Sequence, residues 1–218
     1  MLTFALPTGR SFGECVKILE CSGLPVSGLK DAGRSLVIEE GAFRYILSKP
    51  SDVPAMVYYG AADLALAGND VIEEAGIALA ELLDTGLGRC RMAVAGTSEI
   101  AEKFRGGAQR LMGLKVATKY ARLAERTFAG WGVQIKLLKL NGSVELAPAL
   151  GLADCIFDVV QTGKTLEANG LSVIKETLPV SLRLVAGVSS IQLRWNSIFG
   201  VVGAVNSAVE AKKWKQES

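Results

Sequence analysis

The chain has 218 residues, 50% of them hydrophobic and 21% charged, and its formal net charge is +2 at neutral pH. These values predict a globular protein with one large domain or two small ones, and they exclude a disordered or fibrous chain. So small a net charge gives no electrostatic reason to expect nucleic-acid binding. No apolar run approaches the roughly 20 residues of a membrane span, and the N-terminus does not resemble a signal peptide, so we expect a cytoplasmic protein that does not contact a membrane.

The absence of histidine limits the chemistry that the chain can perform. Without histidine, and without a CxxC pair among the four cysteines, the sequence excludes His-based catalytic triads and the usual zinc sites. We expect all four thiols to be small core residues rather than ligands or disulfides: Cys15, Cys21, Cys90 and Cys155.

The first part of the chain alternates short apolar runs with segments of helical period, which predicts a mixed α/β fold with parallel strands. The expected elements are a strand over residues 2–6, a helix over 11–21, paired strands over 35–39 and 42–47, a short helix opened by 52–54, a buried strand over 62–67 and a helix over 71–75. We expect Asp52 and Asp70 to cap the two later helices, with a tight turn at Gly68.

The pattern restarts at Arg89 and returns near Pro179, which predicts that the middle of the chain is inserted in the first domain. Domain I is then 1–88 plus 178–218, and domain II is 89–177. The expected elements of the second part are strands over 91–96, 114–118, 133–140 and 155–160, helices over 118–128 and from 142–145, a polar stretch over 98–113, two strands within 172–186 and a final helix over 191–213. Ser143 is the expected cap of the helix that follows residue 142.

The segment DCIFDVVQTGKTLEANGL, residues 154–171, carries the clearest chemical signal. A buried strand ends at Thr162-Gly163-Lys164-Thr165, where glycine allows close approach of the backbone and a helix beginning near Thr165 would direct free N–H groups at an anion. A nucleoside-triphosphate P-loop would need glycine where the chain has Asp158, so that interpretation fails. An ordinary strand-to-helix turn with a threonine cap remains the alternative. A strand, an acidic residue and TGxT together resemble the loop of phosphoribosyltransferases, which holds a ribose 5-phosphate while the carboxylate binds ribose hydroxyls.

Several segments together resemble the short form of ATP phosphoribosyltransferase. They are LPTGR at residues 6–10, SDVPAMVYYGAADLALAGNDVIEE at 51–74, LGRCRMAVAG at 87–96, VATKYARLAERTF at 116–128 and LNGSVELAPALGLADCIFDVVQTGKTLEANGL at 140–171. The resemblance implies two α/β domains of the periplasmic-binding-protein-like (type II) architecture, with the active site in the cleft between them. It also implies attack of adenine N1 of ATP on C1 of phosphoribosyl pyrophosphate, with Mg2+ required. The implied assembly is a dimer of catalytic chains within a larger complex that contains a regulatory subunit similar to histidyl-tRNA synthetase.

The resemblance also implies roles for individual residues. Asp158, Arg10 and Glu145 are the expected catalytic residues, although GSVE at 142–145 also reads as a capping box out of register. The expected phosphoribosyl pyrophosphate ligands are Asp154, Asp158, Gln161, Thr162, Gly163, Lys164 and Thr165, and for Asp154 a structural role is an equal alternative. The expected ATP ligands are Arg10, Asp63, Gly142 and Ser143, with Asp63 ending a strand. No metal ligand is assigned.

Four residues depart from the family's pattern. Thr8 stands where a lysine is usual, Tyr59 where an acidic residue or histidine is common, and Asn69 and Lys49 replace a lysine and an arginine. Loss of the first-loop lysine removes one phosphate contact, for which Arg10 and Arg34 are the candidate substitutes. An impaired paralogue, a non-enzymatic binding module for nucleotides or anions, and a salvage-type phosphoribosyltransferase are the alternative functions.

Overall fold

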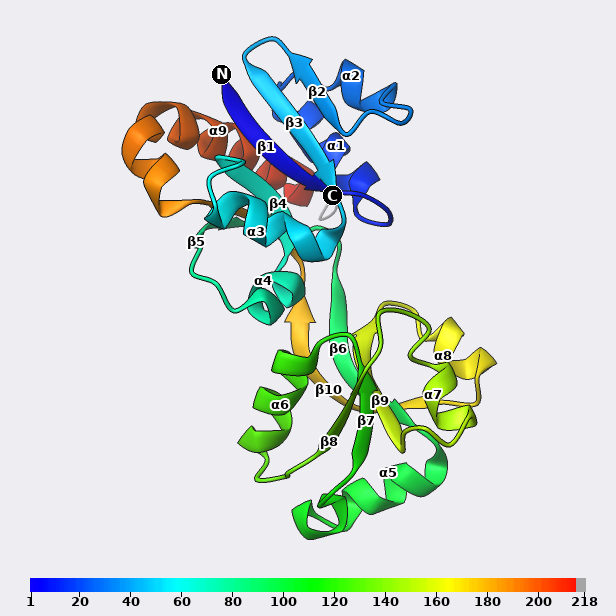
Figure 1. The fold of residues 1–218 in the computed structure, drawn as a ribbon. Coiled ribbons are helices and arrows are strands. Elements are labelled where there is room, and N and C mark those ends of the chain that lie inside the picture. The colour runs from blue at the N-terminus through cyan, green and yellow to red at the C-terminus, as the bar shows by residue number, and fades with distance from the viewer. Residues whose placement is uncertain (215–218) are drawn as a thin grey trace. The chain divides into compact units, whose positions relative to one another are not determined.

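The computed structural model describes residues 1–214, which form two compact units (Figure 1). Unit 1 combines residues 1–88 with the chain from Ser181 onward, and unit 2 comprises Arg89–Val180. Within residues 1–214, no helix has both the length and the apolar character needed to cross a membrane.

Unit 1 is built on a six-stranded sheet with the order β2-β3-β1-β4-β11-β5. Its strands are β1 (Leu2–Pro7), β2 (Val37–Glu40), β3 (Phe43–Ser48), β4 (Leu64–Gly68), β5 (Ala80–Asp84) and β11 (Leu182–Ala186). Its helices are α1 (Phe12–Cys21), α2 (Ser27–Lys30), the 3-10 turn Pro50–Asp52, α3 (Val53–Tyr58), α4 (Asn69–Ala75) and α9 (Val188–Trp214). Strand β1 runs parallel to both β3 and β4, so these three strands end at one edge of the sheet.

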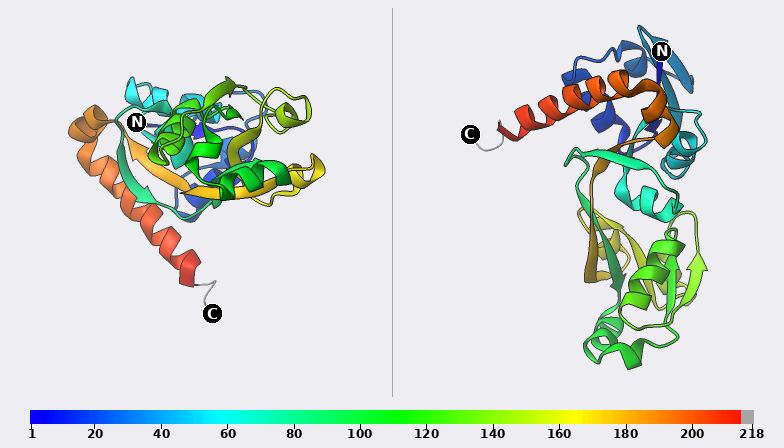
Figure 2. Two further views of the ribbon diagram at one scale, coloured as in Figure 1. Left: turned by 90° about the horizontal axis from the view of Figure 1, so that it is seen from below. Right: turned by 90° about the vertical axis from the view of Figure 1, so that its left-hand side faces the viewer.

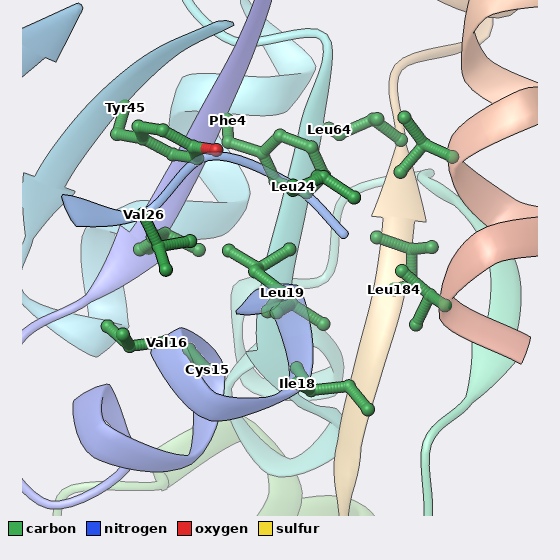
Figure 3. Packing of buried hydrophobic residues seen from close by; sticks show 14 of the residues in the cluster. Phe4, Cys15, Val16, Ile18, Leu19, Leu24, Val26, Tyr45, Leu64 and Leu184 are labelled. Carbon is green, nitrogen blue, oxygen red and sulfur yellow. The ribbon is translucent and has the colours of Figure 1, made fainter. Parts of the chain in front are cut away.

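Helices cover both faces of this sheet. Successive side chains of a strand point to opposite faces, so neighbouring residues of β1 pack against different helices. Phe4 and Leu6 of β1 pack with α1 and α9 on one face (Figure 3), whereas Ala5 packs with α3 on the other. On the first face, burial and then the charge of Glu40 raise the pKa of Tyr45, whose hydroxyl donates to the Pro25 carbonyl at 2.6 Å. Helix α9 is kinked at Arg194, near its start, and then continues as one long rod (Figure 2).

Unit 2 is built on a five-stranded sheet with the order β10-β6-β9-β7-β8. Its strands are β6 (Cys90–Gly96), β7 (Lys115–Thr118), β8 (Lys136–Lys139), β9 (Cys155–Val160) and β10 (Ser172–Val180). Its helices are α5 (Ser98–Arg105), the 3-10 turn Ala108–Leu111, α6 (Ala121–Gly130), α7 (Leu146–Ala149) and α8 (Lys164–Ala168). Strand β7 is parallel to β8 and β9, and β6 is antiparallel to β9 and β10.

The neighbouring residues Ile156 and Phe157 of β9 serve the two faces of this second sheet. Ile156 joins a cluster that contains Ala147 of α7 and Leu166 of α8, and the ring of Phe157 lies 6.4 Å from that of Phe128 in α6. Burial, and then the nearby charge of Asp154, raise the pKa of Cys155 to about 12. This thiol is therefore protonated and unreactive at neutral pH.

Several local predictions are wrong. The polar stretch expected over 98–113 contains α5 and a 3-10 turn, and Ile100 is the one buried residue of α5. Gly68 has an extended backbone and is the N-cap of α4, which places Asp70 inside the helix. Asp52 is the N-cap of α3, as predicted, although its side chain makes no capping hydrogen bond. Only Cys15 and Cys155 are buried: Cys21 is exposed and Cys90 half-buried, and none of the four forms a disulfide.

An aspartate begins one central strand in each unit and fixes the pairing of that strand with its parallel neighbour. The Thr3 N–H donates to Asp63 Oδ2 at 2.9 Å, and the Asp63 N–H returns a bond of 2.8 Å to the Thr3 carbonyl. In unit 2, the Lys115 N–H donates to Asp154 Oδ2 at 2.7 Å, and the Asp154 N–H returns a bond of 2.8 Å to the Lys115 carbonyl. We call each of these reciprocal pairs an aspartate clamp. Both aspartates end a G-x-A-D sequence, at residues 60–63 and 151–154.

Because each clamp satisfies a strand-end N–H, removing its carboxylate should destabilise the unit that contains it. We expect Asp154→Ala to lower the free energy of unfolding by about 1 kcal/mol. Asp63→Ala should cost more, about 2 kcal/mol, because Asp63 is only 14% exposed and also pairs with Arg194 at 3.4 Å. Urea unfolding measures both values, with the surface substitution Asp31→Ala as control. Equal stability of all three variants would contradict the structural role of the clamps.

Candidate active site

The parallel strands of unit 2 bring most of the predicted ligands to one edge of its sheet. Because β7, β8 and β9 run parallel, the residues that follow them, Lys119, 140–145 and 161–165, all lie at their carboxyl ends. In open α/β sheets, ligands bind outside the carboxyl ends of the strands. Asp158, near the end of β9, belongs to the same edge.

The loop over residues 161–165 is open to solvent, as an anion-binding loop must be. Gln161, Thr162, Lys164 and Thr165 are exposed, and Gly163 is half-buried with a φ of 81°. The Lys164 N–H points toward the Thr162 hydroxyl at 3.5 Å. Helix α8 begins at Lys164 and has five residues, so its dipole is weaker than the sequence suggested, and the turn itself supplies the N–H donors.

Arg91 braces the start of this loop from the neighbouring strand β6. Its Nη1 donates to the Gln161 carbonyl at 3.4 Å, and its Nε lies 2.5 Å from a carboxylate oxygen of Glu176 in β10. The sequence did not reveal Arg91, because its place beside the end of β9 depends on the antiparallel pairing of two strands far apart in the chain.

Asp158 is accessible, with 23% of its side chain exposed. One carboxylate oxygen accepts the N–H of the next residue, Val159, at 2.8 Å, and the same oxygen lies 4.0 Å from the Lys119 ammonium. Lys119 was also absent from the predicted site. The signal was available, since Lys119 directly follows a predicted parallel strand.

The loop over residues 142–145 has an unusual backbone. Ser143 has a φ of 48°, the single positive value among the non-glycine residues described, and such conformations often mark functional sites. Ser143 does not cap the following helix as predicted: the N-cap of α7 is Glu145, which makes no capping bond through its side chain. The carboxylate of Glu145 is therefore not committed to the helix, while the buried Val144 and Ala147 anchor the segment.

Asp154 does not share this edge. It precedes β9 at the opposite end of the strand, and its carboxylate forms the clamp with Lys115. This contact supports a structural role for Asp154, the alternative to the expected role as a ribose ligand. The sequence left both roles open because alternation along a strand identifies its face, whereas only the pairing of the strands shows which end meets the ligand.

In unit 1, the predicted residues divide between the two ends of the parallel strands. Thr8, Arg10, Lys49 and Asn69 follow β1, β3 and β4 at their carboxyl edge. Asp63 begins β4 rather than ending a strand, and its carboxylate is engaged by the Thr3 N–H and by Arg194. These contacts support a structural role for Asp63 rather than the expected role in binding adenine. Tyr59 lies just before the same end of β4 and is 81% exposed.

Two of the residues that depart from the family's pattern make internal hydrogen bonds in unit 1. The Thr8 hydroxyl donates to the Ser48 carbonyl at 3.1 Å, which joins the ends of β1 and β3. Asn69 is buried, and its side-chain oxygen accepts the Ser181 N–H at 3.0 Å. Arg10 and Lys49 are exposed at this edge.

The described carboxylates can be compared with the needs of a metal site. Among residues 1–214, no three His, Cys, Asp or Glu side chains gather closely enough to hold a metal ion. At the carboxyl edge of unit 2, Asp158 and Glu145 are the two candidate carboxylates. This number suits Mg2+, which proteins usually bind through one or two carboxylates together with substrate phosphates.

Comparison with known proteins gives a consistent result. The HisG family model, described as ATP phosphoribosyltransferase, matches residues 49–207. The chain is 41% identical over 204 residues to an ATP phosphoribosyltransferase of Rubrobacter xylanophilus, covering 94% of each chain. It is 39% identical over 216 residues to that of Methylobacillus flagellatus, covering 98% of this chain and 100% of the relative.

Solved structures agree with these sequence relatives. A chain of the ATP phosphoribosyl transferase (HisG:HisZ) complex from Thermotoga maritima has a TM-score of 0.82 and 26% identity, covering 97% of this chain and 100% of that one. The periplasmic aliphatic sulphonate binding protein SsuA of Escherichia coli has a TM-score of 0.61 at 16% identity, covering 99% and 75%. The second likeness shows the fold alone, and it confirms the predicted type II periplasmic-binding-protein-like architecture.

Gly163 offers a direct test of the loop geometry. Its φ of 81° strains any L-residue, although a Cβ there would meet no atom within 4 Å. We expect Gly163→Ala to lower the free energy of unfolding by about 1 kcal/mol through backbone strain alone. The matched control is Gly130→Ala at the end of α6, where φ is not positive and space is also open, so that stability should stay equal or rise. Equal effects of the two substitutions in urea unfolding would contradict the left-handed turn.

Proposed function

The chain belongs to the ATP phosphoribosyltransferase family, and from this premise we propose that the carboxyl edge of unit 2 is its binding site for phosphoribosyl pyrophosphate. The activity is transfer of the phosphoribosyl group to N1 of ATP, with release of pyrophosphate, the first step of histidine biosynthesis. The observation that best supports the site is the exposed turn 161–165 beside the accessible Asp158.

Each part of this edge suits one part of the donor. The N–H groups of the turn, the hydroxyls of Thr162 and Thr165 and the ammonium of Lys164 form a set of donors for the 5-phosphate. The carboxylate of Asp158 accepts hydrogen bonds from the ribose hydroxyls. Arg91 acts on the substrate indirectly, by holding the Gln161 carbonyl and with it the start of the turn.

The reaction needs placement and charge rather than a strong base. The bond from C1 to the pyrophosphate oxygen breaks, and its electron pair leaves with pyrophosphate while positive charge grows on the ribose ring. The lone pair of adenine N1 then forms the new bond to C1. One well-placed donor contributes on the order of 3 kcal/mol to such a transition state, so a chain without histidine can catalyse it.

For ATP, we propose the roles that the family resemblance implies for individual residues. Arg10, exposed at the carboxyl edge of the unit 1 sheet, suits the nucleotide phosphates. Gly142 and Ser143 approach the nucleotide through the strained loop of unit 2, and Glu145 supplies a carboxylate. When Mg2+ is bound, it neutralises phosphate charge, and Asp158 and Glu145 are the residues that would hold it together with the substrate.

The assembly and the location follow the same premise. The neighbour from Thermotoga maritima is a complex of HisG with HisZ. We propose that this chain also works with a regulatory subunit similar to histidyl-tRNA synthetase, as a homodimer within a hetero-oligomer in the cytoplasm.

The first experiment is the activity assay. The chain mixed with ATP, phosphoribosyl pyrophosphate and Mg2+ should form phosphoribosyl-ATP slowly alone and faster with its regulatory subunit. Absorbance or chromatography of the product measures the rate. No product under either condition would favour an impaired paralogue.

The second experiment tests the site. We expect Asp158→Asn and Thr162→Ala each to raise the Kd of phosphoribosyl pyrophosphate, about tenfold or more for the charged Asp158. Asp154→Asn, directly before the same strand, is the matched control, and its Kd should stay close to that of the wild type. Calorimetric titration gives these constants, and thermal melting checks folding. Unchanged affinity in both site variants, or equal loss in the control, would exclude the proposed site.

A further inference from the structure

Lys119 stands at a fixed place on the carboxyl edge of unit 2. It directly follows β7, and Thr118, which precedes it, is fully buried. The Thr118 hydroxyl donates to the Phe157 carbonyl at 2.6 Å and accepts the Tyr120 N–H at 2.8 Å. The Thr118 hydroxyl thus links the residues on both sides of Lys119 to Phe157, which precedes Asp158 in β9. These bonds hold the backbone of Lys119 against that strand.

The ammonium of Lys119 is held loosely. Its Nζ lies 4.0 Å from Asp158 Oδ1 and 4.9 Å from the centre of the Tyr120 ring, and 45% of the side chain is exposed. A separation of 4.0 Å is an ion pair but not a hydrogen bond. The ammonium is thus directed to the carboxylate by charge while its N–H donors stay available to a ligand.

The chemistry of the donor decides which anionic group this ammonium would meet. In the α-anomer of the donor, the pyrophosphate on C1 lies on the same face of the ribose ring as the 2- and 3-hydroxyls, whereas the arm that carries the 5-phosphate extends from the opposite face. A cation beside the carboxylate that binds the hydroxyls is therefore on the pyrophosphate side. The 5-phosphate has its own donors in the turn around Gly163.

We propose that Lys119 binds the pyrophosphate group of the donor and stabilises the negative charge that this group gains as its bond to C1 breaks. The inference rests on the proposed function of the same edge. In the free protein, Lys119 partly neutralises Asp158. When the donor binds, the hydroxyls engage Asp158 and the ammonium turns to the pyrophosphate oxygens.

The test compares two lysines of the same strand region. Lys119→Met removes the charge at the carboxyl end of β7, Lys119→Arg keeps it, and Lys115→Met removes an exposed charge at the opposite end. Calorimetry with Mg2+ present measures the Kd of inorganic pyrophosphate and, separately, of ribose 5-phosphate for the full chain. Steady-state assays add kcat and KM for phosphoribosyl pyrophosphate.

We expect Lys119→Met to weaken pyrophosphate binding about tenfold to a hundredfold, the range for a charged hydrogen bond, and to leave ribose 5-phosphate within about twofold. The charge on the leaving group grows in the transition state, so kcat should also fall. Lys119→Arg should restore part of both losses, and Lys115→Met should behave as wild type.

Unchanged pyrophosphate affinity in Lys119→Met would overturn the inference, and so would an equal loss of affinity for both probes, which would mean that the lysine acts on the whole site. These results leave the proposed function intact if the wild type forms phosphoribosyl-ATP. A wild type that forms no product and binds neither probe would overturn the proposed function as well.

Discussion

The parallel pairing of β7 with β8 on one side and with β9 on the other is the constraint on which the site of unit 2 depends. It makes three strands end together, so that loops far apart in the chain can act on one ligand. The buried Thr118 strengthens this arrangement, because its hydroxyl bridges the end of β7 to the Phe157 carbonyl. A shift of one residue in this pairing would turn the side chain of Asp158 to the other face of the sheet.

The two units use the same device at the other end of their strands. An aspartate clamp joins β4 to β1 in unit 1 and β9 to β7 in unit 2, in each case one residue before the first paired residues. A carboxylate at the amino end satisfies the neighbouring N–H and sets the register, which leaves the carboxyl end free for a ligand. This difference between the two ends explains why Asp154, which directly precedes β9, and Asp158, which lies within it, have different roles.

Local signals in the sequence were sufficient for the turn around Gly163, because a strand, a glycine and a helix start are adjacent in the chain. The family and the two-domain architecture followed from longer matches. The strand end at which Asp63 lies was mispredicted and the role of Asp154 was left open, since an acidic residue beside an apolar run looks the same whether it precedes or ends a strand, although the repeated G-x-A-D was a usable sign. Arg91 depends on contacts between distant segments, which no local pattern contains.

The departures from the family's pattern bear unequally on the two substrates. Thr8, Lys49, Tyr59 and Asn69 all belong to unit 1, and the donor site proposed in unit 2 uses none of them. Thr8 and Asn69 stand where the family's pattern has lysines, and their side chains make hydrogen bonds inside unit 1. Lys119 and Lys164 lie at the carboxyl edge of unit 2 and are exposed. Any loss of catalytic power caused by the departures should therefore affect the contribution of Arg10 and its neighbours to ATP binding, while binding of the phosphoribosyl donor is preserved.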